Sequence, residues 1–147
     1  MRQLKLTECL VAPKLQTRVM CIDPGICNVG LALVSIDQDN GVELEAASCT
    51  NISIFPCDHS TCKLQHSATM ADWVAHFIMA NAMAFASADV VLIERQPPGG
   101  LRCCEQLIFE RFRGKAKLLQ PRSMHSFFNM GCMNYEERKH RARNRSL

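Results

Sequence analysis

The sequence predicts an α/β domain in which an initial run of strands is followed by alternating helices and strands. Three observations support this fold class. Apolar runs of strand length, separated by short turns, occupy the first third of the chain. A long segment with apolar residues at helical spacing follows them. Finally, two of the apolar runs each end in a single acid just before a Pro/Gly turn.

The composition is that of an ordinary soluble domain. Hydrophobic residues make up 48% and charged residues 21% of 147 positions, enough for a single core. The chain has no run of about 18 apolar residues and no apolar leader, so we expect no membrane span and an intracellular location. In that setting the nine cysteines are expected to be reduced rather than paired in disulfides.

Positive charge is concentrated towards the C-terminus. Residues 1–110 carry 7 Lys and Arg against 12 Asp and Glu, whereas residues 111–147 carry 10 against 2. A basic block of this kind suits a phosphate backbone, although it could equally be a solvated surface. The candidate nucleic-acid-binding residues are Lys115, Lys117, Arg122, Arg138, Lys139 and Arg141.

The first three strands are predicted to form an antiparallel meander. Residues 1–17 show no clean period and are treated as a flexible lead-in, so the domain is expected to span residues 18–147. Strands are predicted over residues 18–23 and 29–36. The Asn-Gly pair that follows indicates a hairpin, which leads into a third strand over about residues 42–54.

The next segment, residues 55–66, is a predicted loop rich in groups that bind metals. Cys57, His59, Cys62 and His66 could place four soft ligands around a zinc ion, which binds such ligands tetrahedrally. Their spacing matches no standard zinc finger, so a surface loop without a metal is the competing interpretation.

The clearest helix is predicted over residues 69–87. Thr69 with Asp72 three residues later gives a start that resembles a capping box. Apolar residues then recur at helical spacing, so one face should pack on the sheet, and Trp73 is expected to belong to that core.

The remaining elements are shorter. A second helix is predicted over residues 101–113, with Gly114 as its C-terminal cap. A short strand over residues 115–120 should end at Pro121, and a last helix should begin near Tyr135.

Asp23 and Glu94 are the two acids that end apolar strands, over residues 18–23 and 89–94. If these strands are neighbours in a parallel pair, the two carboxylates lie side by side. Burying two like charges together costs several kcal/mol unless a cation joins them, and a divalent ion with carboxylate ligands is the natural solution. The alternative is that the acids merely shape their turns, because Asp, Pro and Gly are ordinary turn residues.

Both acids lie in motifs that resemble those of RuvC-type Holliday junction resolvases. Ile22-Asp23-Pro24-Gly25-Ile26-Cys27-Asn28-Val29-Gly30 resembles the first acidic motif, and Leu92-Ile93-Glu94-Arg95-Gln96 resembles the second. The segments that continue the likeness are similar to resolvases encoded by large DNA viruses of the poxvirus and iridovirus type, and they cover residues 97–100, 105–109, 121–125 and 135–139. The resemblance spans roughly residues 18–141.

The resemblance implies a ribonuclease H-like fold, with a mixed five-stranded sheet of three antiparallel strands followed by parallel strands and flanking helices. It also implies a Mg²⁺-dependent, structure-selective endonuclease that resolves four-way DNA junctions during viral recombination or replication. Such an enzyme would act as a homodimer on branched DNA in the cytoplasm or nucleus of a host cell.

The same resemblance implies four carboxylates around two Mg²⁺ ions. Asp23 and Glu94 match the first two, as metal ligands and catalytic residues. The other two, expected on a C-terminal helix, have no counterpart before residue 147, so we expect that helix to be truncated. Two alternatives remain: a relative that holds nucleic acid without cleaving it, and a sugar-kinase-like domain. The second would need a further phosphate loop and a further domain.

Overall fold

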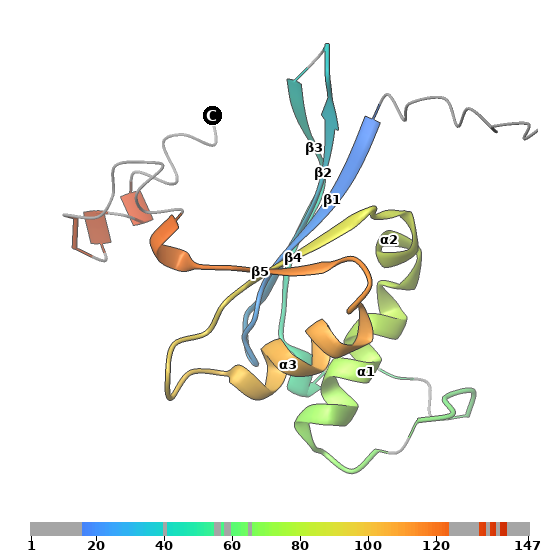
Figure 1. Cartoon of the computed structure of the whole chain (residues 1–147). Coiled ribbons are helices and arrows are strands. Elements are labelled where there is room, and N and C mark those ends of the chain that lie inside the picture. The colour runs from blue at the N-terminus through green and yellow to red at the C-terminus, as the bar shows by residue number, and fades with distance from the viewer. Residues whose placement is uncertain are drawn as a thin grey trace, which may run out of the picture.

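The protein is described by a computed structural model for residues 16–39, 41–54, 57, 60–64, 66–123, 133–134, 136–137 and 139–140. Five strands in this part of the chain form one mixed sheet of order β3-β2-β1-β4-β5 (Figure 1). They are β1 (Gln16–Asp23), β2 (Val29–Asp37), β3 (Gly41–Thr50), β4 (Val90–Glu94) and β5 (Ala116–Leu119). The first three strands are antiparallel, whereas β4 lies parallel to β1, and β5 lies parallel to β4. The predicted mixed α/β sheet is confirmed.

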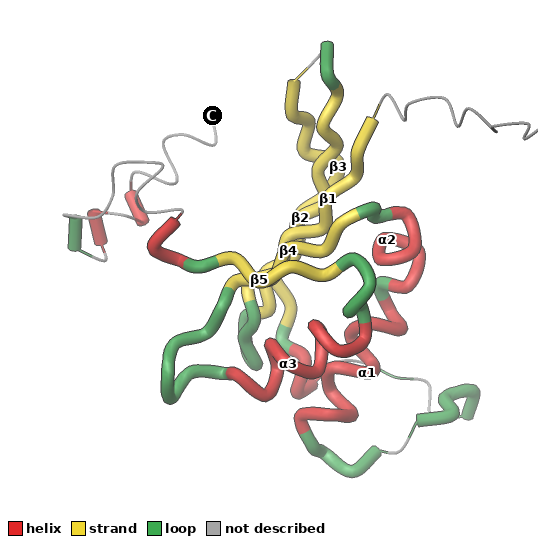
Figure 2. The backbone as a smooth tube through the Cα atoms, viewed as in Figure 1, coloured by secondary structure: helices red, strands yellow, loops and turns green. Residues whose placement is uncertain are grey.

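The three labelled helices gather on one face of this sheet (Figure 2). They are α1 (Met70–Ala80), α2 (Ala82–Ser87) and α3 (Arg102–Arg111), and a 3₁₀ turn, η1 (Ile52–Ile54), follows β3. The opposite face of β1, β4 and β5 carries none of these three helices. None of the helices in the described ranges is both long enough and apolar enough to span a bilayer.

The side chains of β1 and β4 alternate between the core and the opposite face of the sheet, called the helix-free face because α1, α2 and α3 lie on the other side. Met20 and Ile22 of β1 and Val91 and Ile93 of β4 are buried under the helices. Because side chains of a strand point alternately to the two faces, the intervening residues of β1 and β4 face the other way. Asp23 and Glu94 therefore belong to the helix-free face.

Aromatic contacts fix the helices over the sheet. Phe77 of α1 meets Phe85 of α2 edge-on, with ring centroids 6.1 Å apart, and Phe85 stacks on Phe112 at 4.4 Å. Trp73 packs against the same core, as predicted. The predicted start of α1 is also confirmed, because the Thr69 hydroxyl accepts a hydrogen bond from the Asp72 N–H.

The long helix predicted over residues 69–87 is in fact two helices. The break falls at Asn81, whose side-chain Nδ2 and backbone N–H both donate to the carbonyl of Phe77, at 2.8 and 3.2 Å. An asparagine side chain competes in this way with regular helical bonding. The break starts a new helix, α2, which carries Phe85 onto Phe112.

Two other predicted boundaries were wrong. The third strand ends at Thr50 rather than near residue 54, because the N–H of Ile52 donates to the carbonyl of Ile26 and the chain turns into η1. Helix α3 ends with Phe112 as its C-cap, whose N–H donates to the carbonyls of Ile108 and Phe109. The predicted cap, Gly114, does not have the positive φ that would mark it as one.

Candidate active site at the carboxyl ends of β1 and β4

The parallel pairing of β1 and β4 brings two acids to one edge of the sheet. Ile22 lies opposite Ile93 in this pair, so Asp23 and Glu94 occupy the next positions of the register. Their carboxyl groups are close enough for Asp23 to raise the pKa of Glu94. The parallel neighbours that the sequence-based hypothesis required are thus present.

Two glycines shape the turn that follows Asp23. A Cβ atom at Gly25 would lie only 2.5 Å from the carbonyl oxygen of Asn28, so a larger residue would force the backbone apart. A Cβ at Gly30, opposite Asp23 in the β1–β2 pair, would lie 3.3 Å from the Cβ of Asp23. Glycine at these positions allows the turn to close tightly beside the acid.

Helix α3 supports the loops behind both acids. The Cys104 thiol contacts the carbonyl of Gly25 at 3.8 Å. The Glu105 side chain, in a residue only 2% exposed, accepts a 2.6 Å hydrogen bond from the N–H of Gln96, two residues beyond Glu94. Sequence reasoning missed this positioning residue. The sequence does contain a signal for it: an acid occupies the apolar face of the predicted helix, four residues after Leu101.

Burial raises the pKa of Glu94 to about 7, and the negative charge of Asp23 and the hydrogen bond to it act in the same direction. The bond raises the pKa because protonated Glu94 donates to Asp23. Below about pH 7, Glu94 is therefore mainly protonated. A divalent cation could replace that proton, since carboxylate oxygens are the ligands that Mg²⁺ prefers, so this pair fits such an ion.

The two carboxylates line a hollow of about 400 Å³ on the helix-free face of the sheet. Most of the surrounding side chains are apolar, and burial raises the pKa of the Cys21 thiol among them. The wall includes Cys21, Ala32, Leu92, Leu119 and Pro121. A large ligand can approach the acids here.

Basic residues flank this hollow on the β5 side. Lys117 lies opposite Leu92 in the β4–β5 register, is exposed, and alternates with Leu118, which packs on the core. It therefore shares the helix-free face with the two acids. Arg122 is exposed beside Pro121, and Lys139 is exposed further along the chain. Arg138 and Arg141 lie outside the described residues.

Lys115 occupies a different place from the one expected. Its Nζ donates to the carbonyls of Phe85 and Ala88 at 2.6 and 2.8 Å, and so caps the C-terminal end of α2. It precedes β5 and lies beside the beginning of β4, where its carbonyl accepts from the N–H of Val91. Because β4 and β5 are parallel, that is the end of the sheet away from Glu94. The expectation that Lys115 holds phosphate at this site is corrected.

Two methionine substitutions test this separation of roles. Lys115→Met should lower the free energy of unfolding by about 1–3 kcal/mol, because two carbonyls lose a charged donor, and should leave DNA affinity unchanged. Lys117→Met, two residues later on β5, should leave stability unchanged and should reduce the salt dependence of the DNA binding expected from the sequence by about one phosphate contact. Denaturant unfolding and salt titrations of binding measure both. The reverse pattern would contradict the assignment.

Three of the four metal-binding groups that the spacing of the 55–66 loop suggested are gathered in the structure, and one further residue joins them. Cys57, Cys62 and His66 lie together with His76 of α1, and His59 lies outside the described residues. Sequence reasoning missed His76 because it lies within the predicted helix, where a single histidine does not indicate a metal ligand.

Comparison with known proteins identifies the fold. No protein-family model matches the chain, and no curated protein is significantly similar to it in sequence. The yeast mitochondrial Holliday junction resolvase Ydc2 is similar in structure with a TM-score of 0.58 and 20% identity, over 76% of this chain and 56% of that one. This chain therefore spans little more than half of the yeast protein.

Two further solved structures give the same result. A complex of the fowlpox virus resolvase with Holliday junction DNA matches with a TM-score of 0.55 and 17% identity, over 87% of this chain and 72% of that one. Thermus thermophilus RuvC matches with a TM-score of 0.50 and 17% identity, over 82% and 75%. The chain thus has a ribonuclease H-like fold. All three of these structures are Holliday junction resolvases, so the fold resembles that of RuvC.

Proposed function

We propose that the protein is a Mg²⁺-dependent endonuclease that cleaves four-way DNA junctions. One observation carries the proposal: Asp23 and Glu94 lie side by side at the carboxyl ends of parallel strands and line an open hollow. The resolvase-like fold around this pair supports the same reaction.

Both residues of the pair would take part in this reaction as metal ligands. Bound Mg²⁺ would supply an activated water and stabilise the leaving oxygen of the scissile phosphate. Asp23, the more exposed of the two, and Glu94 would hold the metal. Glu94 would release its proton when a cation takes its place, so metal binding and deprotonation would be coupled at this edge.

Branched DNA is the substrate that the surface suits best. Lys117 and Arg122 stand beside the hollow, where they would contact phosphates. Phosphate contacts position a nucleic acid without reading its bases, so recognition would depend on the shape of the junction. Symmetric cleavage of a junction needs two sites, and we propose that a homodimer supplies them during viral recombination or replication inside a host cell.

A second function, DNA binding without cleavage, is favoured by a specific observation. The described lining of the hollow includes two carboxylates, whereas the resemblance to resolvases implies four. Binding of this kind would persist in a chelator and weaken steeply with salt, because phosphate contacts release counterions.

Incubation of the purified chain with a labelled four-way junction separates the two functions. A linear duplex of the same arm sequence serves as the control substrate. We expect paired nicks in the junction with Mg²⁺, none with EDTA and none in the duplex. Salt-sensitive binding without cleavage would establish the second function instead, and failure to bind or cleave the junction would remove both.

A further inference from the structure

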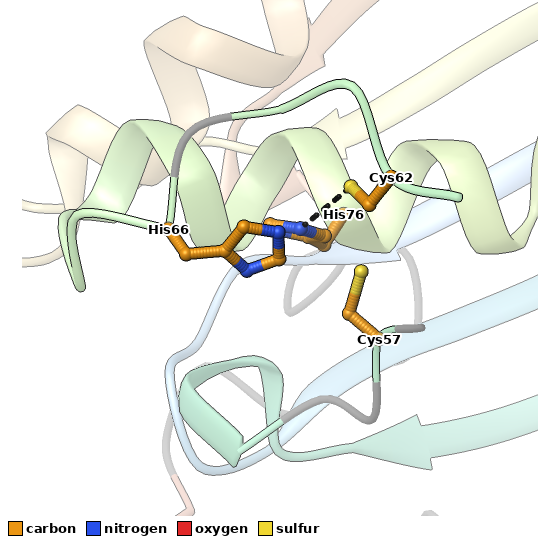
Figure 3. Close-up of side chains that lie close together, drawn as sticks. All are labelled: Cys57, Cys62, His66 and His76. Atoms are coloured by element: carbon orange, nitrogen blue, oxygen red, sulfur yellow. Dashed lines mark hydrogen bonds between the residues drawn. The ribbon is translucent and has the colours of Figure 1, made fainter. Parts of the chain in front are cut away.

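Two cysteines and two histidines lie together beside helix α1 (Figure 3). None of these four residues lines the hollow that contains Asp23 and Glu94. We propose that Cys57, Cys62, His66 and His76 form a structural zinc site that fastens the loop over residues 57–66 to helix α1. The site does not depend on the nuclease function proposed above.

The ligand atoms are already close to the spacing of a tetrahedral site. All four lie within 4.8 Å of one another, and Cys62 Sγ lies 3.4 Å from His76 Nε2. With Zn–S near 2.3 Å and Zn–N near 2.0–2.1 Å, tetrahedral geometry puts ligand atoms about 3.3–3.8 Å apart. The ligand atoms would need to approach one another by about 1.5 Å at most to coordinate an ion.

His76 is oriented as a ligand from within α1. Its Nδ1 lies 2.7 Å from the carbonyl oxygen of Asp72, which can only accept, so Nδ1 carries the proton. The lone pair is therefore on Nε2, the atom that faces Cys62. Metal-binding histidines are usually held by such a bond from their other ring nitrogen. The residue is only 8% exposed, so its ring is firmly placed.

A hydrogen bond also fixes the position of the Cys62 sulfur. The backbone N–H of Leu64, two residues later, donates to its sulfur at 3.4 Å. A bond of this kind holds the sulfur in place and is compatible with metal binding, because metal-bound cysteine sulfur also accepts hydrogen bonds from N–H groups. The thiols of Cys57 and Cys62 are in no disulfide.

His66 is brought to the cluster by the first turn of α1. Both the N–H and the hydroxyl of Ser67 donate to the carboxylate of Asp72, at 2.6 and 2.5 Å. The His66 ring then lies 4.8 Å from the ring of His76, centroid to centroid. Asp72 thus helps to position both histidines. Its carbonyl contacts His76 directly, and its carboxylate holds Ser67, the residue that follows His66.

The loop has few apolar contacts with which to hold this shape. None of its described residues, 57, 60–64 and 66, is buried. A segment of this kind gains order from a metal more readily than from packing. Two thiolates and two imidazoles select zinc over Mg²⁺, and four protein ligands leave no open position, so the role is structural rather than catalytic.

Metal analysis of the full chain, purified without added zinc, tests the proposal. We expect about one equivalent of zinc, and loss of most of it in Cys57→Ser/Cys62→Ser. The matched control is Cys27→Ser/Cys49→Ser, because both of these cysteines are exposed and lie outside the cluster. It should keep its zinc. Zinc absent from the folded wild type, or lost equally from the control, would overturn the site.

Two histidine variants then test the fourth ligand. His66→Ala and His76→Gln should each weaken zinc binding, whereas His59→Ala should leave it unchanged. Reconstitution with Co²⁺ gives an independent signal, because a tetrahedral site with two thiolates has characteristic visible absorption bands, which should change in His76→Gln. Loss of zinc from His59→Ala with retention in His76→Gln would overturn the assignment of His76. Circular dichroism establishes that each variant is folded.

Discussion

Replacing Asp23 with asparagine is expected to lower the rate of junction cleavage by about a hundredfold or more, with the affinity for junction DNA nearly unchanged. Asparagine keeps the shape of the side chain but removes a charge that holds the metal. The matched control is Asp39→Asn in the β2–β3 turn, an exposed residue far from the β1–β4 edge. Cleavage by Asp23→Asn at the wild-type rate would contradict the proposed function.

The same variant has a second expected result that does not involve cleavage. In the absence of metal, Asp23 repels the carboxylate of Glu94 and raises its pKa. Removing that charge should make the metal-free protein at least as stable as the wild type at pH 8, and should abolish stabilisation by Mg²⁺. Thermal unfolding with and without Mg²⁺ measures both effects. A variant that is unfolded at pH 8 would assign Asp23 a structural task instead.

The metal-free protein is expected to lose stability as the pH rises from about 4.5 to about 7. The pKa of Glu94 is raised from 4.5 to about 7 in the folded protein, so the folded state holds a proton that the unfolded state has released. Stability is therefore full below the unfolded pKa and falls as the pH rises through this window. Because Glu94 is partly exposed to solvent, we expect a loss of about 1–2 kcal/mol.

Denaturant unfolding in EDTA at several pH values between 4.5 and 8 measures this slope. Subtracting the profile of Glu94→Gln isolates the contribution of this residue, and the exposed Glu43→Gln serves as the control, which should keep the wild-type slope. Mg²⁺ should stabilise the wild type more at pH 8 than at pH 5.5, because it competes with the proton on Glu94. Identical slopes for wild type and Glu94→Gln would contradict the raised pKa.

The β1–β4 edge could be predicted from sequence because it depends on local patterns. Each acid ends an apolar run just before a Pro/Gly turn, and hydrophobic alternation fixes which face each side chain takes. The short turns among the first three strands likewise fixed their antiparallel order. Only the adjacency of β1 and β4 had to be assumed.

The features that sequence reasoning missed depend on contacts between distant segments. The charge of Lys115 does not reveal that the carbonyls of α2 lie within its reach, some 30 residues earlier in the chain. His76 becomes a candidate ligand only because the loop folds back over α1. Glu105 looks like an ordinary helix acid until the N–H of Gln96 is found beside it.

Two hydrogen bonds at the other end of the β1–β4 pair have a consequence for how the molecule folds. The N–H of Arg18 donates to the carboxylate of Asp89, and the N–H of Asp89 donates to the carbonyl of Arg18, across a sequence separation of 71 residues. Closing so long a loop costs more entropy than closing the hairpins that join β1, β2 and β3. We therefore expect the meander to form before β1 pairs with β4 and brings Asp23 beside Glu94. The proposed metal site would thus depend on this long-range pairing rather than on the local contacts of the meander.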